Sequence, residues 1–217
     1  MLITSLFKEY DKLQQIYGDK NLDAIYGCGN IRNPKVCLVF MNPTARNVSA
    51  NKNWKGIKAP WLGTKHVWNM FYHLGLFNED IIEEINSKKP QDWDYIFSEK
   101  VYKIVSDNSI YITNLSKATQ IDARPLPNDV FKQYRELFKQ EMNQVKPEII
   151  ITFGNQVSSV LLEKNIKVSE YRKKNEILDI HGGNYKVFPV YYPVGQGMRN
   201  IKIAKEDIAW IIKTQIK

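Results

Sequence analysis

Three short apolar segments of this chain each run directly into a polar residue, and they constrain its fold more than any other feature. The segments and the residues that follow them are Val36–Met41 with Asn42, Ser109–Thr113 with Asn114, and Lys186–Tyr191 with Tyr192. Apolar runs of this length, bounded by polar residues or proline, are typical of strands buried on both faces of a sheet. The carboxyl ends of parallel strands meet at one edge of an open α/β sheet, where ligands bind. We therefore expect the three polar side chains to lie together.

Helical patterns separate these predicted strands. Helices are predicted over Leu6–Ile16, Lys65–Leu76, Glu79–Asn86, Trp93–Val105, Pro127–Val145, the segment after Gly154-Asn155, and Ile203–Ile216. Ile149–Phe153 is a further strand and Ile177–Ile180 an edge strand, whereas Tyr26–Ile31, Thr44–Gly63 and Leu115–Pro125 are loops. Strands that alternate with helices favour a parallel sheet with helices on both faces. We predict a single domain over residues 1–217, a three-layer α/β/α sandwich around a short, mainly parallel four-stranded sheet.

The composition narrows the class of protein. Of the 217 residues, 43% are hydrophobic and 25% charged, which is ordinary for a soluble globular domain. No apolar stretch approaches the ~20 residues of a membrane span. The N-terminal residues Met1–Tyr10 lack the charged start of a signal peptide. We expect a cytoplasmic, monomeric protein with no membrane partner.

Metal-binding residues are few. Cys28 and Cys37 cannot form a metal cluster by themselves, and Cys37 lies in a predicted core strand, where a small buried hydrophobe is the simpler interpretation. The three histidines are scattered without metal-ligand spacing. We predict no metal and no cofactor.

The chain is basic, with 31 Lys and Arg against 23 Asp and Glu and a net charge of +8. This excess favours a polyanionic partner, although many soluble proteins are as basic. The loop after the first strand holds several of these residues, with tryptophans between them: Arg46, Lys52, Trp54, Lys55, Lys58, Trp61 and Lys65. Such a mixture is expected of a surface that contacts phosphates and stacks on bases, and equally of a solvated lysine-rich loop.

Five segments occur in an order that is hard to obtain by chance. They are Tyr26–Asn30 leading into Val36–Pro43, Pro60–Gly63, Tyr111–Lys117 with Arg124-Pro125, Lys146–Gly154, and Phe188–Pro193 with Arg199-Asn200. Together they resemble the motifs of the uracil-DNA glycosylase superfamily, roughly from Tyr26 to Ile211. The resemblance implies an α/β/α fold and a cofactor-independent enzyme that acts on DNA.

The chain departs from the iron–sulfur branch of that superfamily, which is the closest in layout. Ala118 and Gln133 stand in place of two of the four cysteine ligands of that branch, and Met41 stands in place of an acidic residue. Asn42-Pro43 instead resembles the mismatch-specific and single-strand-selective branches, in which an asparagine positions the attacking water.

Three further departures concern glycines and a histidine. Phe40 and Thr44 replace the glycines that normally open and close the first motif, and Tyr192 stands where most members have a catalytic histidine. Phe40 either narrows the pocket or points into the core.

The resemblance assigns candidate catalytic and base-binding residues. Asn42 is the candidate for orienting water, although an asparagine before proline also starts turns. Asn114 is the candidate for reading an extruded base together with Met41, and Trp61 for stacking on it; the simpler alternatives are a turn asparagine and a buried tryptophan. Tyr192 either donates a hydrogen bond to the leaving base or fills space.

DNA contacts are expected from two loops. In the loop Gly195–Asn200, Gln196 faces DNA, Met198 is a candidate wedge for the gap left by the extruded nucleotide, and Arg199 is a candidate phosphate ligand; the alternative is a flexible surface loop. Lys65 and His66 are candidate phosphate contacts at a helix N-terminus.

The function expected from these residues is hydrolysis of the N-glycosidic bond of uracil, or of a related deaminated base, in DNA. Preference for mismatched or single-stranded sites is expected, because unstacking is easiest there. One alternative is a non-catalytic or differently specific nucleic-acid-binding relative. Another is an enzyme that acts on free nucleotides or nucleosides.

Overall fold

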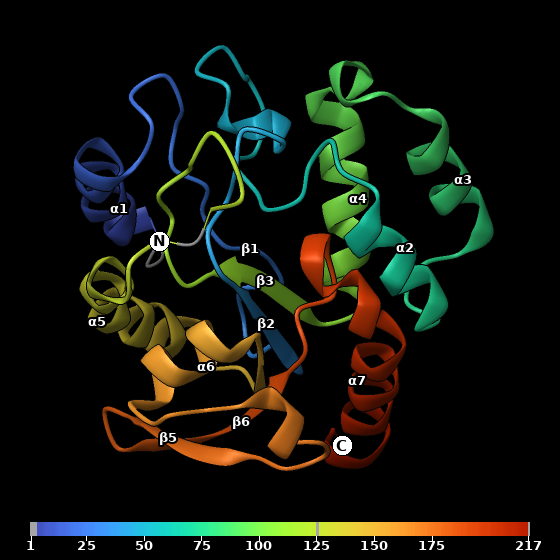
Figure 1. The fold of residues 1–217 in the computed structure, drawn as a ribbon. Helices are drawn as coiled ribbons and strands as arrows, with labels where there is room; N and C mark the ends of the chain where they lie inside the picture. Colours follow the sequence, from blue (N-terminus) through green and yellow to red (C-terminus); the bar gives the residue numbers. More distant parts are fainter. Residues whose placement is uncertain (1–3, 125, 217) are drawn as a thin grey trace.

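A six-stranded sheet forms the centre of the computed structural model, which describes residues 4–124 and 126–216 (Figure 1). Its strands are β1 (Cys28–Gly29), β2 (Val36–Phe40), β3 (Ile110–Asn114), β4 (Ile149–Phe153), β5 (Glu176–Ile180) and β6 (Gly183–Val190). Their order across the sheet is β1-β3-β2-β4-β6-β5. Every residue of β2, β3 and β4 is buried, as expected of strands covered on both faces.

The four central strands are parallel, which confirms the main sequence prediction. β2 pairs in parallel with β3 and β4, and β4 pairs in parallel with β6. The two edge strands are antiparallel, β1 against β3 and β5 against β6. The predicted count of four strands is therefore too low by two. Residues Cys28 and Gly29 were expected in a loop, because a two-residue strand has no alternation to reveal it.

Helices cover both faces of the sheet and confirm the three-layer prediction. They are α1 (Thr4–Tyr17), α2 (His66–His73), α3 (Glu79–Ser87), α4 (Tyr95–Asp107), α5 (Asn128–Val145), α6 (Asn155–Leu162) and α7 (Ile201–Gln215). Short 3-10 turns are η1 (Val48–Ala50), η2 (Pro90–Asp92), η3 (Val168–Glu170) and η4 (Gly195–Asn200). Each predicted helix is present, with ends that differ by a few residues.

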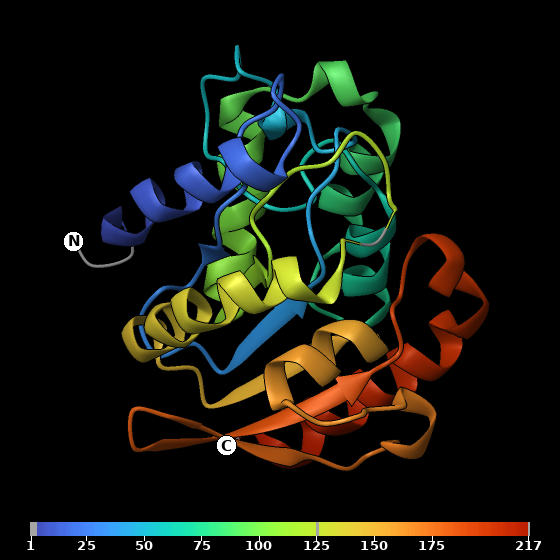
Figure 2. The ribbon, with the colours of Figure 1, turned by 60° about the vertical axis from the view of Figure 1, so that its left-hand side comes forward.

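Side-chain alternation along β2 divides the core into two halves. Val36, Leu38 and Phe40 pack with α2, α3, α4 and α7, whereas Cys37 and Val39 pack with α1, α5 and α6. Figure 1 shows α1, α5 and α6 on one side of the sheet and α2, α4 and α7 on the other. Figure 2 shows α5 and α6 side by side on their face.

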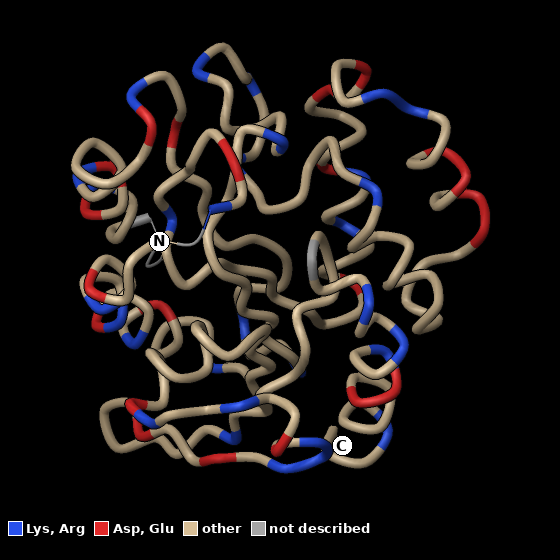
Figure 3. The backbone as a smooth tube through the Cα atoms, in the orientation of Figure 1, with Lys and Arg blue, Asp and Glu red and all other residues tan. Residues whose placement is uncertain are grey.

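Charged residues are spread over the outer loops and helices on all sides rather than gathered on one face (Figure 3). Among the described residues, no helix combines the length and the apolar character that crossing a membrane would require.

Phe40, the last residue of β2, points into the core. Its side chain is fully buried, and its ring stacks on Phe153 with centroids 4.4 Å apart. The same ring meets the edge-on rings of Trp61 at 4.8 Å and Tyr192 at 6.1 Å. Phe40 therefore supports Trp61, in the loop after β2, and Tyr192, in the segment after β6.

We expect Phe40→Ala to lower the free energy of unfolding by about 3–5 kcal/mol, because it leaves a cavity in a closely packed cluster. Urea denaturation measures this loss. Phe77→Ala, which removes a buried ring that packs on Trp68 and Phe71 in the same half of the core, should cost a similar amount. A loss below about 1 kcal/mol for Phe40→Ala would contradict the core placement.

Candidate functional site

A pocket of about 870 Å³ opens at the carboxyl ends of β2 and β3 and beside the segment that follows β6. Seven of the residues singled out as catalytic, base-binding or DNA-binding line it: Met41, Asn42, Trp61, Lys65, His66, Asn114 and Tyr192. The expectation that the three strand-end polar residues converge is therefore confirmed. The pocket also lies within the size range of small-molecule and cofactor sites.

Backbone hydrogen bonds hold the two asparagine-bearing segments side by side. Phe40 and Asn114 are partners in the β2–β3 register. Beyond the strands, the amide of Leu115 donates to the carbonyl of Phe40 at 2.8 Å, and the amide of Ser116 donates to the carbonyl of Met41 at 3.0 Å. A bridge between Thr44 and Gln120 continues the pairing. The pocket floor is thus an extension of the sheet rather than a free loop.

The side chain of Asn42 has a defined orientation. Its Nδ2 donates to the carbonyl oxygen of Pro43 at 3.1 Å. A carbonyl can only accept, so the NH₂ end of the amide must face it. The Oδ1 atom accepts no hydrogen bond from any described residue and remains available at the pocket wall.

Asn114 presents an unpaired amide to the pocket. Its exposed fraction is only 2%, yet its side chain makes no hydrogen bond within the described residues. An amide offers two donors and an acceptor oxygen. Although most of the residue is buried, its amide atoms are not among the buried unpaired atoms of the described residues, so they are open to the pocket. They can therefore bond to water or to a polar ligand there.

Trp61 is held on the pocket wall by an unusual backbone. Its φ of +67° lies in the left-handed region, which costs about 1–3 kcal/mol for a residue other than glycine. The carbonyl of Trp61 accepts from Thr64 Oγ1 at 2.7 Å and from Trp68 Nε1 at 3.2 Å. The carbonyl of Pro60 accepts from the hydroxyl of Tyr102 at 2.7 Å. These bonds fix the indole beside the edge of the Phe40 ring.

Tyr192 faces the pocket with a neutral hydroxyl. Burial raises its pKa well above the ordinary value of 10, and the hydroxyl makes no hydrogen bond with a described residue. The loop that follows passes close behind it. A Cβ on Gly197 would lie 1.9 Å from the carbonyl oxygen of Tyr192, so this approach requires glycine.

The basic rim of the pocket is smaller than the sequence suggested. Arg46, Lys65 and His66 line the pocket, and Lys65 Nζ donates to the carbonyl oxygen of Asn86. Of the remaining loop lysines, Lys52 donates to the carbonyl of Lys20, whereas Lys58 pairs with Asp23. Trp54 donates to the carbonyl of Ile57 and packs against the core. Most of the lysine–tryptophan loop is therefore folded away from the pocket.

The loop Gly195–Asn200, observed as η4, supplies the opposite rim. Gly195 and Gly197 line the pocket, but Met198 and Arg199 do not; both are exposed, Met198 by 40%. The side chain of Gln196 and the whole of Pro125, which follows Arg124 in the third motif, lie outside the described residues.

A family model described as the uracil DNA glycosylase superfamily matches residues 26–211. The chain belongs to that superfamily. The match contains all six strands, the pocket and every predicted site residue.

The chain is also similar to part of a curated protein. Over 93 residues, which are 41% of this chain and 43% of the relative, the sequence is 30% identical to the type-4 uracil-DNA glycosylase of Saccharolobus solfataricus. The chain therefore spans less than half the length of the curated relative it matches.

The residues do not fit the iron–sulfur cluster found in one branch of the superfamily. Such a cluster is typically held by four cysteine thiolates, and the whole sequence has two cysteines. Burial raises the pKa of the Cys28 thiol to about 12 and that of Cys37 well above its usual value, so both stay protonated. Ala118 is buried in its loop, and Gln133 lies on α5. Within the described ranges, no three His, Cys, Asp or Glu side chains gather as metal ligands.

Several contributors to the pocket were not foreseen, two of them separated in the sequence from the predicted site residues. Pro90 in η2 and Ala123 in the loop after β3 both line it. No local pattern marks Pro90, because its position depends on packing between distant segments: Asn69 on α2 exchanges side-chain hydrogen bonds with Asn86 on α3, shortly before η2.

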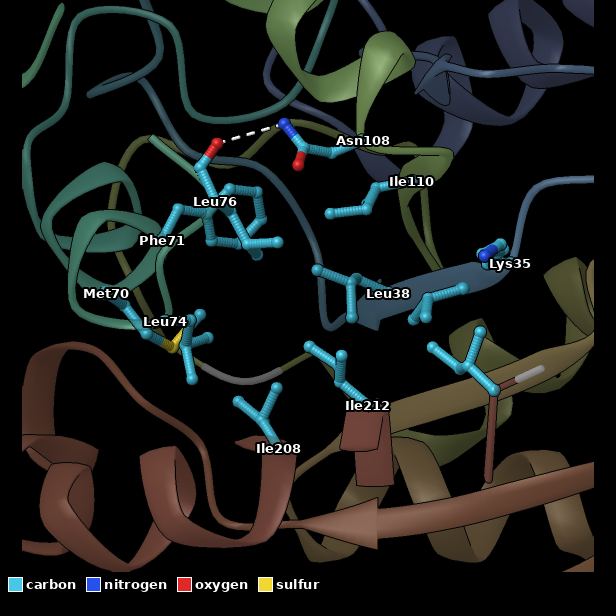
Figure 4. A pocket seen from close by; sticks show the side chains of 12 residues that line it. Lys35, Leu38, Met70, Phe71, Leu74, Leu76, Asn108, Ile110, Ile208 and Ile212 are labelled. Atoms are coloured by element: carbon cyan, nitrogen blue, oxygen red, sulfur yellow. Dashed lines mark hydrogen bonds between the residues drawn. The ribbon is translucent and has the colours of Figure 1, made fainter. Parts of the chain in front are cut away.

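A second, smaller cavity of about 230 Å³ lies at the other end of the sheet (Figure 4). Apolar side chains from the start of β2, from α2 and its C-terminal turn, and from α7 point into it, among them Leu38, Phe71, Leu74, Ile208 and Ile212. Asn108, on its wall, already donates to the carbonyl of Leu76. None of the candidate site residues whose side chains the structure describes lines this cavity.

We expect Gly197→Ala to displace η4, because the new methyl group would overlap the carbonyl of Tyr192. Overpacking of this kind costs about 1–3 kcal/mol, measurable as a lower free energy of unfolding in urea. Gly183→Ala, whose Cβ would be 3.2 Å from its nearest neighbour, is the matched control and should cost less. Equal stability of Gly197→Ala and the parent would contradict the close approach.

Proposed function

We propose that this protein hydrolyses the N-glycosidic bond of uracil, or of a related deaminated base, in DNA and leaves an abasic site without a cofactor. The unpaired Asn114 amide carries this proposal. Uracil offers an acceptor, O4, next to a donor, N3–H, and one amide can pair with both. Cytosine presents the reverse order, so an amide held in one orientation discriminates between the two bases.

Asn42 is proposed to orient the attacking water. Its Nδ2 is bonded to Pro43, so its Oδ1 is the atom left to accept a hydrogen bond from water. The role needs no ionisation, which suits a side chain that does not titrate. The base departs as an anion, and donors aimed at its oxygens stabilise the developing charge.

Trp61, Met41 and Tyr192 are proposed to enclose the extruded base. The indole of Trp61 is fixed by its backbone bonds and offers a face for stacking, which is worth about 1–3 kcal/mol per base. The neutral hydroxyl of Tyr192 is proposed to donate a hydrogen bond to an oxygen of the departing base, in place of the usual histidine. Met41 contributes apolar contact beside Asn42.

DNA is proposed to cross the pocket mouth between the Lys65–His66 rim and η4. Met198 is exposed and lies next to Arg199, so an apolar wedge and a phosphate ligand stand together on that rim. Gln196 belongs to the same loop. An enzyme of free nucleosides would have no use for such a wedge. Because unstacking is easiest at mismatched or single-stranded sites, those substrates are proposed to react fastest.

Labelled oligonucleotides with one uracil, single-stranded or opposite guanine or adenine, test the proposal. We expect alkali-sensitive cleavage by the parent protein, and a loss of about 10²-fold or more in rate for Asn42→Ala and Asn114→Ala, because misplaced reactants lose at least that much. Asn175→Ala, at an exposed position away from the pocket, should retain the parent rate.

Absence of cleavage of all three substrates, with DNA still bound at low salt, would reject uracil excision. It would favour the differently specific relative that the Tyr192 replacement suggests, and other lesion bases would then be the substrates to assay. Activity on free deoxyuridine without salt-sensitive DNA binding would instead favour a nucleoside enzyme.

The pH profile tests Tyr192. Because burial raises its pKa above 10, the hydroxyl stays protonated and should leave the cleavage rate flat between about pH 6 and 9. Tyr192→Phe should reduce the rate about 10-fold, less than the ~10²-fold loss for an ideally placed donor. Tyr192→His should add a transition near the histidine pKa of about 6.5. An unchanged rate in Tyr192→Phe would show that the ring only fills space.

A further inference from the structure

A buried ion pair lies directly behind the pocket floor. Lys117 Nζ is 2.8 Å from Glu141 Oε2, and the two side chains have exposed fractions of 0% and 1%. Lys117 belongs to the loop after β3, whereas Glu141 is on the buried face of α5. Neither residue lines the pocket, and neither has a role in the proposed reaction.

The lysine ammonium is fully satisfied, and one of its bonds reaches Asn114. Nζ donates to Glu141, to Thr113 Oγ1 at 2.6 Å and to the backbone carbonyl of Asn114 at 2.5 Å, which uses its three donors. It also lies 4.9 Å from the centre of the Tyr10 ring. Lys117 therefore binds the side chain of Thr113 and the backbone carbonyl of Asn114.

The glutamate ties the same strand to two helices. Its Oε1 accepts from the hydroxyls of Tyr111 at 2.7 Å and Thr113 at 2.8 Å, and its Oε2 accepts from Tyr10 on α1 at 2.8 Å. The backbone of Gly27 closes the cluster from outside, since a Cβ there would lie 2.6 Å from Glu141 Oε1 and 1.9 Å from the hydroxyl of Tyr111.

Stability does not explain a cluster of this kind. Removing two charges from water is costly, and an apolar replacement of a buried ion pair is often neutral or stabilising. The cluster instead orients the end of β3. Its bonds go to Thr113, to the carbonyl of Asn114, or to side chains that hold Lys117 and Glu141 in place. The bonds to the Thr113 hydroxyl and to the Asn114 carbonyl fix where the Asn114 side chain enters the pocket.

We propose that Lys117 and Glu141 are positioning residues that hold Asn114 in the orientation that selects the base. This inference rests on the proposed function, since it gives Asn114 a base to select. It predicts that the pair acts on the reaction only through Asn114, and not through DNA binding.

The test replaces both charges at once, as Lys117→Met with Glu141→Leu, so that no unpaired charge is left buried. Single-turnover cleavage of the uracil oligonucleotide should fall about 10- to 100-fold, within the loss expected of a misplaced group. Binding of a duplex without uracil should change less than about twofold. Thermal unfolding should occur at a lower temperature but remain cooperative, because the hydroxyls of Tyr10, Tyr111 and Thr113 lose their acceptor. In an Asn114→Ala background the same pair of substitutions should cost nothing further, because coupled positions are not additive.

Two results would overturn the inference. One is the parent rate in a folded double variant. The other is an equal loss in the presence and absence of Asn114, which would indicate a general structural role.

A second readout separates this inference from uracil excision itself. The side-chain amide resonances of Asn114, assigned by their loss in Asn114→Ala, should shift or broaden in the double variant. Those of Asn47, another pocket residue whose amide donates to the carbonyl of Ala59, should not. If the parent protein cleaves no uracil, the proposed function fails, but these resonances still test whether the Lys117–Glu141 pair positions Asn114. Unchanged Asn114 resonances in the folded double variant would reject positioning by the pair.

Discussion

The structure depends most on the backbone hydrogen bonds between β2 and β3, which continue into the segments that follow the two strands. Pairing continues from Phe40–Asn114 through Met41 and Ser116 to the bridge at Thr44 and Gln120. Backbone bonds, rather than flexible loops, therefore set the separation of Asn42 and Asn114. A site that needs two amides in a fixed relation gains from being an extension of a sheet, because elements of regular structure position side chains more precisely than loops do.

An aromatic layer below the pocket compensates for departures from the superfamily's usual residues. Phe40 stands where a glycine is usual, yet its ring is buried and does not enter the pocket. It fills the space between Phe153, Trp61 and Tyr192, so the bulk added at one position supports the wall at two others. The replacements at positions 40 and 192 are therefore in contact and form one local arrangement rather than two separate changes.

The sequence could predict those parts of the molecule that local patterns determine. Buried strands can be recognised as apolar runs, and the helices between them indicate parallel pairing. The convergence of Asn42, Asn114 and Tyr192 could therefore be predicted. Long-range contacts could not. Lys52 and Lys58 looked like part of a DNA-facing loop because their partners, the carbonyl of Lys20 and the carboxylate of Asp23, lie about thirty residues earlier. Lys117 looked like an ordinary motif lysine, because its counter-ion lies on α5.

The polar groups of this protein fall into two sets with opposite properties. Behind the pocket, Lys117, Glu141 and their partners satisfy one another, which is the condition for burying charge without loss of stability. Facing the pocket, the Asn114 amide, Asn42 Oδ1 and the Tyr192 hydroxyl have no partner among the described residues. Among the described residues, four buried side-chain atoms also lack a hydrogen-bond partner, and one of them, Trp61 Nε1, belongs to a residue of the pocket. The groups of Asn114, Asn42 and Tyr192 all face the same pocket. A binding site without its ligand needs such groups, because only donors and acceptors that are free of protein partners can exchange water for a ligand.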